Sequence, residues 1–262
     1  MQFNPSVGYG IFLLGRPLQL TKTVNITKEV RATVGIVILA AGASTRMGTS
    51  KQLLLYQGRS LLCRIVETAL ASVCQPTIVV LGASAEQLQQ EIKHLPVQVV
   101  ENLQWAEGMS SSIFTGINVL NAESVKVSAV VLLLCDQPLV CVQVINQLVE
   151  THYSTGKPII ASEYSATLGV PALFSHTFFP ELMTLKGGEG AKQLLKNHSE
   201  DVYSLPFPDG VIDIDTPEDY EQLSRGGRGG SGGSGAGGQR RQGEVITNFS
   251  SKEFQIVKAF LP

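Results

Sequence analysis

The chain has 262 residues, of which 44% are hydrophobic and 16% charged, and its formal net charge is −2. Residues 34–225 carry 11 Lys and Arg against 19 Asp and Glu, whereas the segments before and after them are each basic. An acidic central segment argues against a folded surface that binds nucleic acid, because such surfaces need clustered Lys and Arg.

The first predicted elements alternate between strands and helices. Short apolar and β-branched runs predict strands at residues 34–40, 77–81, 97–100, 127–134 and 158–162. Stretches with helical periodicity predict helices at residues 61–73, 84–93, 110–120 and 142–153, with N-caps at Ser60, Ser84 and Ser110. This alternation is typical of an α/β fold with a mostly parallel sheet.

The alternation weakens after Tyr164. We expect further strands at residues 170–174 and 201–207, and short helices at residues 176–184 and 189–197. Thr216, Pro217 and Glu218 predict the start of a last helix, because threonine can cap a helix and proline is favoured at its first position.

Composition divides the chain into three parts. We expect residues 34–225 to form one domain with a substantial core, preceded by an N-terminal extension at residues 1–33. Nine glycines occur within residues 226–238, which predicts a Gly-rich flexible tail over residues 226–262. The Arg-Gly-Gly units at Arg225 and Arg228 leave an RNA-binding tail as an alternative, which salt-sensitive RNA binding lost on truncation at Ser224 would support.

The sequence shows no sign of a membrane or secreted protein. No apolar run approaches the roughly 20 residues of a membrane-spanning helix, and the apolar stretch at residues 11–14 is too short for a signal peptide. The four cysteines have no Cys-x-x-Cys spacing, which indicates neither a disulfide framework nor a zinc site. We therefore expect a reduced, cytoplasmic setting without a membrane partner.

The segment after the first predicted strand is rich in small residues and reads LAAGASTRMGTSK over residues 39–51. Small residues let successive backbone N–H groups surround an anion, and Arg46 and Lys51 could both reach one polyphosphate. No Asp or Glu occurs from Val30 to Val66, although several basic residues do. A plain glycine turn with solvated basic residues is the alternative, because the loop matches neither the Walker nor the Rossmann pattern.

Acidic residues occur at two places where strands or extended segments end. Asp136 follows the apolar run at residues 130–134, and Asp213 and Asp215 alternate on one face of a short extended segment. Ligands of open parallel sheets bind beyond the carboxyl ends of the strands, where Asp136 and the small-residue loop would meet. Carboxylates at that position could bind Mg2+ beside phosphate oxygens. Each acid alone is more often a turn or cap residue, but the combination with a basic glycine loop favours a metal site.

Five short motifs occur in order between residues 39 and 219. They read LAAGASTRMG at 39–48 with Lys51, WAEGMSSSI at 105–113, CDQP at 135–138, TLGVPALF at 167–174 and DIDTPED at 213–219. Together they resemble the MobA-like NTP transferases, and within that family the molybdenum cofactor cytidylyltransferase branch. The resemblance covers roughly residues 34–223 and implies a Rossmann-like three-layer α/β/α sandwich of the nucleotide-diphospho-sugar transferase type.

The same resemblance implies roles for individual residues. Arg46, Lys51 and Asp136 would be catalytic, and Asp136 and Asp215 would bind Mg2+. Ser112 is the serine favoured for contact with the base, although the serine-rich segment could instead cap its own helix. The implied nucleotide-binding residues are Ala40, Ala41, Gly42, Ser44, Arg46, Lys51, Gly108, Ser110 and Ser112.

Two motifs bear on which nucleotide is used. The guanylyltransferases of the family usually read Leu-Ala-Gly-Gly and Asp-Met-Pro, whereas this chain has Ala-Ala-Gly at residues 40–42 and Asp-Gln-Pro at residues 136–138. The resemblance therefore favours CTP over GTP. Where the family often has Gly-Asp-x-Gly-Ala-Arg, this chain reads GGEGAK at residues 187–192, which leaves the acceptor less defined than the nucleotide.

The implied activity is a Mg2+-dependent transfer of CMP from CTP to a phosphorylated acceptor, with release of pyrophosphate. Molybdopterin is the acceptor that the resemblance favours, and a molybdoenzyme could then be a client. The same site could serve another phosphorylated acceptor, such as an isoprenoid or sugar phosphate. A non-catalytic maturation factor would instead bind the cofactor without consuming CTP.

Overall fold

The computed structural model describes residues 32–123, 126–188 and 190–226. The predicted extension at residues 1–33 and the predicted tail at residues 226–262 lie almost entirely outside these ranges. The described residues divide into two units, with the boundary between Gln222 and Leu223. The fold that follows is that of the first unit.

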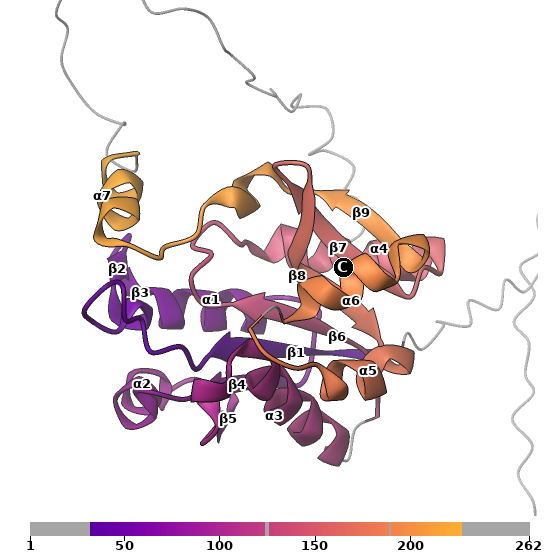
Figure 1. Ribbon diagram of the computed structural model, residues 1–262, viewed down its shortest axis with the longest axis horizontal. Helices are drawn as coiled ribbons and strands as arrows, with labels where there is room; N and C mark the ends of the chain where they lie inside the picture. The colour runs from indigo at the N-terminus through magenta and orange to yellow at the C-terminus, as the bar shows by residue number, and fades with distance from the viewer. Residues whose placement is uncertain (1–31, 124–125, 189, 227–262) are drawn as a thin grey trace, which may run out of the picture. The chain divides into compact units, whose positions relative to one another are not determined.

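A seven-stranded sheet forms the centre of this unit, in the order β5-β4-β1-β6-β8-β7-β9 (Figure 1). β8 runs antiparallel to its neighbours β6 and β7, and every other neighbouring pair is parallel. The predicted mostly parallel α/β sheet is therefore confirmed. The strands are β1 (Thr33–Ala40), β4 (Thr77–Leu81), β5 (Gln98–Glu101), β6 (Val127–Leu134), β7 (Ile159–Tyr164), β8 (Thr167–Ser175) and β9 (Val202–Pro206), with β2 (Leu55–Tyr56) and β3 (Arg59–Ser60) in a separate hairpin.

Helices cover both faces of the sheet. α3, α5 and α6 contribute to one buried cluster with β1, β4, β6, β7 and β8, while α1 and α4 contact strands and each other. This layering confirms the Rossmann-like α/β/α sandwich. The helices are α1 (Leu61–Leu70), α2 (Ala85–Ile92), α3 (Met109–Ala122), α4 (Val142–Thr155), α5 (Phe179–Thr184), α6 (Ala191–Asn197) and α7 (Pro217–Gly226).

β1 shows why the central strands are apolar throughout. Val37 and Leu39 belong to the cluster that includes α3, whereas Ile36 and Ile38 alternate with them and are also fully buried. Because successive side chains point to opposite faces of a sheet, a strand covered on both sides must be apolar at every position. Burying each such side chain contributes about 1.5–3 kcal/mol.

Gly116 lets α3 lie close against β1. A Cβ atom at this position would come within 2.4 Å of Val37 Cγ1 and 3.1 Å of Val80 Cγ2. A larger residue would therefore move α3 away from the sheet, and with it the start of the helix at the edge of the cavity described below.

The predicted helix caps have different outcomes. Ser60 caps α1, because its hydroxyl accepts the N–H of Cys63 at 3.1 Å. Ser84 is the N-cap residue of α2, as predicted, but its hydroxyl makes no capping bond and instead shares a hydrogen bond with Ser50 at 2.8 Å. The prediction for Ser110 is wrong, because α3 begins one residue earlier, with Gly108 at its N-cap.

Two further findings concern the sequence predictions on cysteines and membranes. The four cysteines are all free. Among the described helices, none combines the length and apolar character needed to cross a bilayer.

Candidate active site

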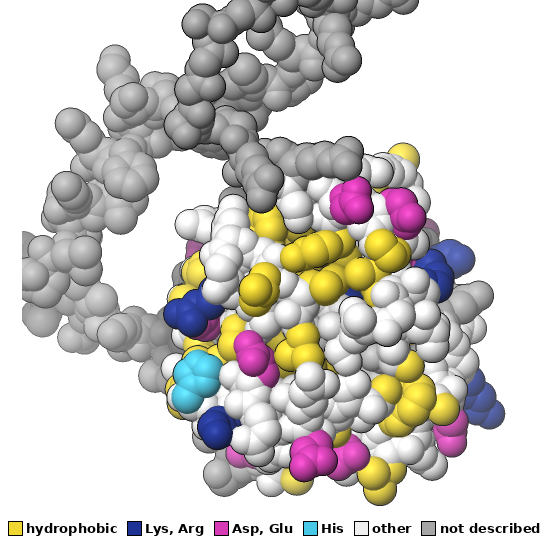
Figure 2. All heavy atoms as spheres, turned by 90° about the vertical axis from the view of Figure 1, so that its left-hand side faces the viewer, with side chains coloured by type: hydrophobic (Ala, Val, Ile, Leu, Met, Phe, Trp, Pro, Cys, Tyr) yellow, Lys and Arg dark blue, Asp and Glu magenta, His cyan; other side chains and the backbone are white. Residues whose placement is uncertain are grey.

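A cavity with a volume of about 860 Å³ opens at the carboxyl ends of β1 and β6, the edge at which open α/β sheets bind ligands. β1 and β6 end toward the left in Figure 1. Figure 2 shows the molecule from that side, where hydrophobic, basic and acidic side chains lie near one another. Most of the predicted site residues line this cavity. They are Ala40, Ala41, Gly42, Arg46, Lys51, Gly108, Ser112, Asp136 and Asp215.

The loop after β1 offers mainly backbone to this cavity. Gly42 has open space where a side chain would begin, so a ligand can approach the main chain. Ser44 has a φ of 54°, in the left-handed region. Its hydroxyl accepts the backbone N–H of Lys51 at 3.1 Å and donates to Gln52 Oε1 at 3.2 Å. The Ser44 side chain therefore supports the loop from within, and its contact with a nucleotide stays a prediction.

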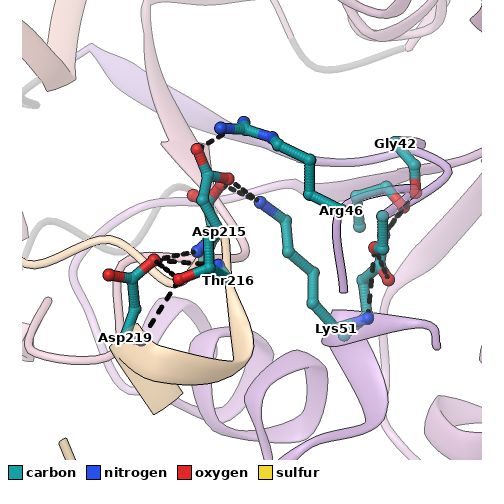
Figure 3. A network of polar contacts seen from close by, with 10 residues as sticks. Gly42, Arg46, Lys51, Asp215, Thr216 and Asp219 are labelled. Atoms are coloured by element: carbon teal, nitrogen blue, oxygen red, sulfur yellow. Dashed lines mark hydrogen bonds and ion pairs between the residues drawn. The ribbon is translucent and has the colours of Figure 1, made fainter. Parts of the chain in front are cut away.

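Two basic residues of the loop pair with the two predicted metal ligands (Figure 3). The Lys51 ammonium lies 2.6 Å from Asp136 Oδ2 and 2.8 Å from Asp215 Oδ1, and so bridges the two carboxylates. Arg46 reaches the other oxygen of Asp215 at 2.6 Å. Residues 46, 51, 136 and 215, which are distant in sequence, thus form one ionic cluster.

The protonation of these groups follows from their surroundings. The hydrogen bond from Lys51 lowers the pKa of Asp215, with a further contribution from Arg46 and in opposition to desolvation. Burial alone would lower the pKa of Lys51, but Asp136 and Asp215 outweigh it and the net shift is upward. Partial desolvation, followed by repulsion from Asp136 and Asp215, raises the pKa of nearby Asp213. Lys51 is therefore charged and Asp215 ionised at neutral pH.

Asp215 is held in place from two sides. The backbone N–H of Ile214 donates to Asp136 O at 3.0 Å, which ties this segment to the end of β6. Asp219 Oδ2 accepts the N–H of Asp215 at 3.2 Å and the N–H of Thr216 at 2.8 Å, and Thr216 caps the N–H of Asp219 in return. This reciprocal capping, visible in Figure 3, confirms the predicted helix start at Thr216 and fixes the carboxylate that precedes it.

The two carboxylates fit a small divalent cation. Both reach one point, the position of the Lys51 ammonium, and Asp136 Oδ1 is buried without a hydrogen-bond partner among the described residues. Among the described residues, no group of three or more His, Cys, Asp or Glu is placed to hold a metal. A cation here would thus have few protein ligands and would complete its shell with phosphate oxygens and water, as Mg2+ commonly does.

The start of α3 forms another wall of the cavity. Gly108 has a φ of 106°, which favours glycine, and Ser112 lines the cavity. Buried Asn102 donates to Ser112 Oγ at 3.0 Å, and no described residue accepts the Ser112 hydroxyl proton, so this hydroxyl can donate to a ligand. Ser110 does not line the cavity, because its hydroxyl donates to the carbonyl of Gly187 at 2.6 Å.

Sequence reasoning missed two buried glutamines at this site. Gln52 is 2% exposed and bonds the loop after β1. Gln137 is 4% exposed and donates to Val170 O at 3.0 Å and Gly210 O at 3.3 Å, which joins β8 to the segment before Asp215. In the sequence, each glutamine is a polar residue next to an apolar run. That position could have marked them as buried, but it does not predict their hydrogen-bond partners.

A second group of basic and polar side chains, from α6 and the β7–β8 hairpin, also lines the cavity. Lys192 and Lys196, one helical turn apart on α6, line it, as do Tyr164, Ser165 and Thr167 of the β7–β8 hairpin. None of the cavity-lining residues is a histidine. The cavity is therefore lined by basic residues from two parts of the chain, the segment after β1 and α6.

Comparisons with known proteins show which family the chain belongs to. The purine catabolism protein PucB of Bacillus subtilis (strain 168) is 34% identical over 199 residues, which span 72% of this chain and 95% of the relative. A Nostoc sp. protein named "Probable molybdenum cofactor guanylyltransferase" is 28% identical over 194 residues, or 70% of this chain and 86% of that protein. The crystal structure of Rv0371c from Mycobacterium tuberculosis H37Rv in complex with manganese is similar with a TM-score of 0.60 and 26% identity, and the match covers 73% of this chain and 98% of that one. Residues 36–202 match the MobA-like NTP transferase domain, and the chain therefore belongs to this nucleotidyltransferase family.

Proposed function

We propose that this nucleotidyltransferase moves CMP from CTP to a phosphorylated acceptor of the molybdopterin type and releases pyrophosphate. The observation that carries the proposal is the ionic cluster at the cavity mouth, where Lys51 lies 2.6 Å from Asp136 and 2.8 Å from Asp215. A polyphosphate–metal complex needs carboxylates for the metal and basic side chains for the phosphates, and this cluster brings both together next to an exposed backbone loop.

CTP is the proposed donor because of two short segments. Ala40, Ala41 and Gly42 line the cavity in the loop after β1, and Asp136 and Gln137 line it after β6. Both segments read as they do in the cytidylyl branch that the motifs resemble. The Nostoc relative is named for a guanylyl transfer, so the nucleotide has to be decided by experiment.

The residues of the chain act by positioning and by neutralising charge. The acceptor's phosphate oxygen attacks the α-phosphorus of CTP, and the bond to the bridging oxygen breaks, so that pyrophosphate leaves with the electron pair. A phosphate monoester is already ionised at neutral pH, and no base is required. Arg46 and Lys51 can bind oxygens of the departing pyrophosphate, where charge accumulates. A Mg2+ ion held by Asp136 and Asp215 would supply further neutralisation of phosphate charge.

We propose that the acceptor binds in the part of the cavity beside α6. Lys192 and Lys196 lie there on one face of α6 and line the cavity, and both could bind an acceptor that carries negative charge. Molybdopterin is proposed because a relative is named for molybdenum cofactor chemistry. Isoprenoid and sugar phosphates are the alternatives to be tested beside it.

The test is a pyrophosphate-release assay with CTP, GTP and ATP, each with and without a molybdopterin-type acceptor, in the presence of Mg2+. We expect acceptor-dependent release with CTP, and a loss of about 10²-fold or more in turnover for Arg46→Ala, as for other preorganised charge-stabilising donors. Arg59→Ala is the matched control, since within the described part of the chain the Arg59 side chain makes one exposed ion pair, with Glu67 at 3.5 Å. Equal turnover of Arg46→Ala, Asp136→Asn and the parent would overturn the assignment of the site. Preference for GTP would overturn only the nucleotide.

A further inference from the structure

Gln52 has a polar side chain that is buried against the loop after β1. It follows Lys51, is 2% exposed, and lies on a short helical turn, Lys51–Leu53. A buried amide is stable only when its donors and acceptor are paired. The hydrogen-bond partners of the Gln52 amide therefore indicate its structural role.

All of these partners belong to the last residue of β1 or to the loop that follows it. Gln52 Nε2 donates to the carbonyl of Ala40 at 3.2 Å and to that of Gly42 at 2.8 Å. Gln52 Oε1 accepts the Ser44 hydroxyl at 3.2 Å, and Ser44 Oγ accepts the N–H of Lys51 at 3.1 Å. The reverse orientation of the amide would set its oxygen against two carbonyl oxygens, so the network fixes which way the side chain points.

These bonds determine which backbone groups of the loop remain available. The carbonyls of Ala40 and Gly42 are turned toward Gln52 and engaged there. Carbonyl oxygens that faced a polyphosphate would repel it, whereas backbone N–H groups attract it. The same network holds Ser44 at its left-handed φ of 54°, a conformation that is unfavourable for a residue other than glycine.

We propose that Gln52 is a positioning residue that organises the loop of residues 40–44 to bind the polyphosphate of the nucleotide. The proposal rests on the proposed function, in that it takes a nucleoside triphosphate as the ligand of this loop. Gln52 itself does not act on the reacting atoms, because both of its amide hydrogens and its oxygen are already engaged within the loop. Its effect is thus on the affinity for phosphate groups and not on the chemical step.

Two variants separate this role from a general loss of packing. Gln52→Glu keeps the shape and the acceptor for Ser44 but loses both amide donors and adds a carboxyl group, so the neutral variant that follows is the decisive one. Gln52→Met keeps a similar volume and loses all three bonds. Ser162→Ala is the matched control, because the Ser162 hydroxyl is fully buried and donates to Pro171 O at 2.6 Å, outside the residues that line the cavity.

The measurement is calorimetric titration of the full chain with CTP, and separately with tripolyphosphate, in Mg2+, together with steady-state kinetics and thermal unfolding. We expect both Gln52 variants to bind CTP and tripolyphosphate about tenfold more weakly, because at least two hydrogen bonds that orient the loop are lost. KM for CTP should rise by a similar factor while kcat stays within about twofold, the pattern of lost uniform binding. Ser162→Ala should lose stability and keep the parental affinities.

Each outcome decides between specific claims. Folded Gln52 variants that bind both anions with parental affinity would overturn the positioning role and leave the proposed function standing. Loss of affinity of the same size in Ser162→Ala would overturn it too, since the effect would then be one of stability alone. A parent protein that binds neither CTP nor tripolyphosphate would overturn the proposed function together with this inference.

Discussion

Replacing Lys51 with methionine tests the ionic cluster, because it removes one ammonium and keeps a side chain of similar length. The Lys51 Nζ atom lies 2.6 Å from Asp136 and 2.8 Å from Asp215, and the three side chains are 16%, 18% and 30% exposed. Without the ammonium, two carboxylates face one another with only Arg46 to balance them. We therefore expect Lys51→Met to be less stable than the parent.

The size of the effect follows from the partial burial of the cluster. Breaking a buried ion pair costs about 3–5 kcal/mol, and exposed pairs contribute about 0–1 kcal/mol. An intermediate value of about 2 kcal/mol corresponds to a decrease of about 4–8 °C in the unfolding temperature of a domain of this size. A divalent cation should then restore stability, because it can take the place of the ammonium between the carboxylates.

Thermal unfolding with and without Mg2+ or Mn2+ measures both effects. We expect either metal to raise the unfolding temperature of Lys51→Met by several degrees more than that of the parent. Lys93→Met is the matched control, because the Lys93 ammonium donates only to Gln90 at an exposed position. Parental stability of Lys51→Met, or an equal response of parent and variant to metal, would refute this account of the cluster.

The remaining predictions concern pH, helix capping and packing. Because the pKa of Asp215 is lowered in the folded state, the ionised carboxylate should stabilise the fold at pH values above the ordinary Asp range. This contribution should be lost as pH falls through the folded pKa. In a plot of stability against pH, Asp215→Asn should therefore lose less stability on acidification than the parent. The pKa of Lys51 is raised, so its contribution should persist to alkaline pH and be lost as pH rises through the folded pKa, which unfolding at pH 9–12 would show. Ser60→Ala should cost about 1 kcal/mol in denaturant unfolding, and Ser84→Ala, which removes no cap bond, should cost less; equal losses would contradict the assignment of the caps. Gly116→Ala should destabilise by about 1–3 kcal/mol, because its methyl group would overlap a β1 side chain, and a neutral result would show that α3 can shift at little cost.

Much of the sheet could be predicted because its strands are buried on both faces. β4 (Thr77–Leu81) and β6 (Val127–Leu134) begin and end where the apolar runs do. β8 is longer than predicted, since its pairing with β7 continues to the hairpin, where Tyr164 pairs with Thr167. The additional residues of β8 are in the strand because they pair with β7, and their hydrophobicity does not predict this. α1 ends at Leu70 and not at the predicted residue 73. The apolar spacing from which the helix was predicted continues beyond Leu70, so it does not mark the end of the helix.

The site could be predicted where its chemistry is local in sequence. Asp136, Asp215 and part of the segment 40–51 lie at or just beyond the ends of strands or extended segments, and the fold brings them to one cavity. The glutamines could not be assigned, because their partners are set by tertiary structure. Gln137, for example, bonds the carbonyl of Gly210. Ser44 and Ser110 show the reverse case, in which hydroxyls expected at the nucleotide form bonds within the protein.

The most direct test of the central claim is to follow the phosphorus atoms of CTP. CTP labelled at either the α- or the γ-phosphate would be incubated with the protein, Mg2+ and a molybdopterin-type acceptor, and the products separated. The proposed nucleotidyl transfer predicts that the α-label moves to the acceptor and the γ-label appears in pyrophosphate. A γ-label on the acceptor, or no labelled acceptor at all, would contradict it.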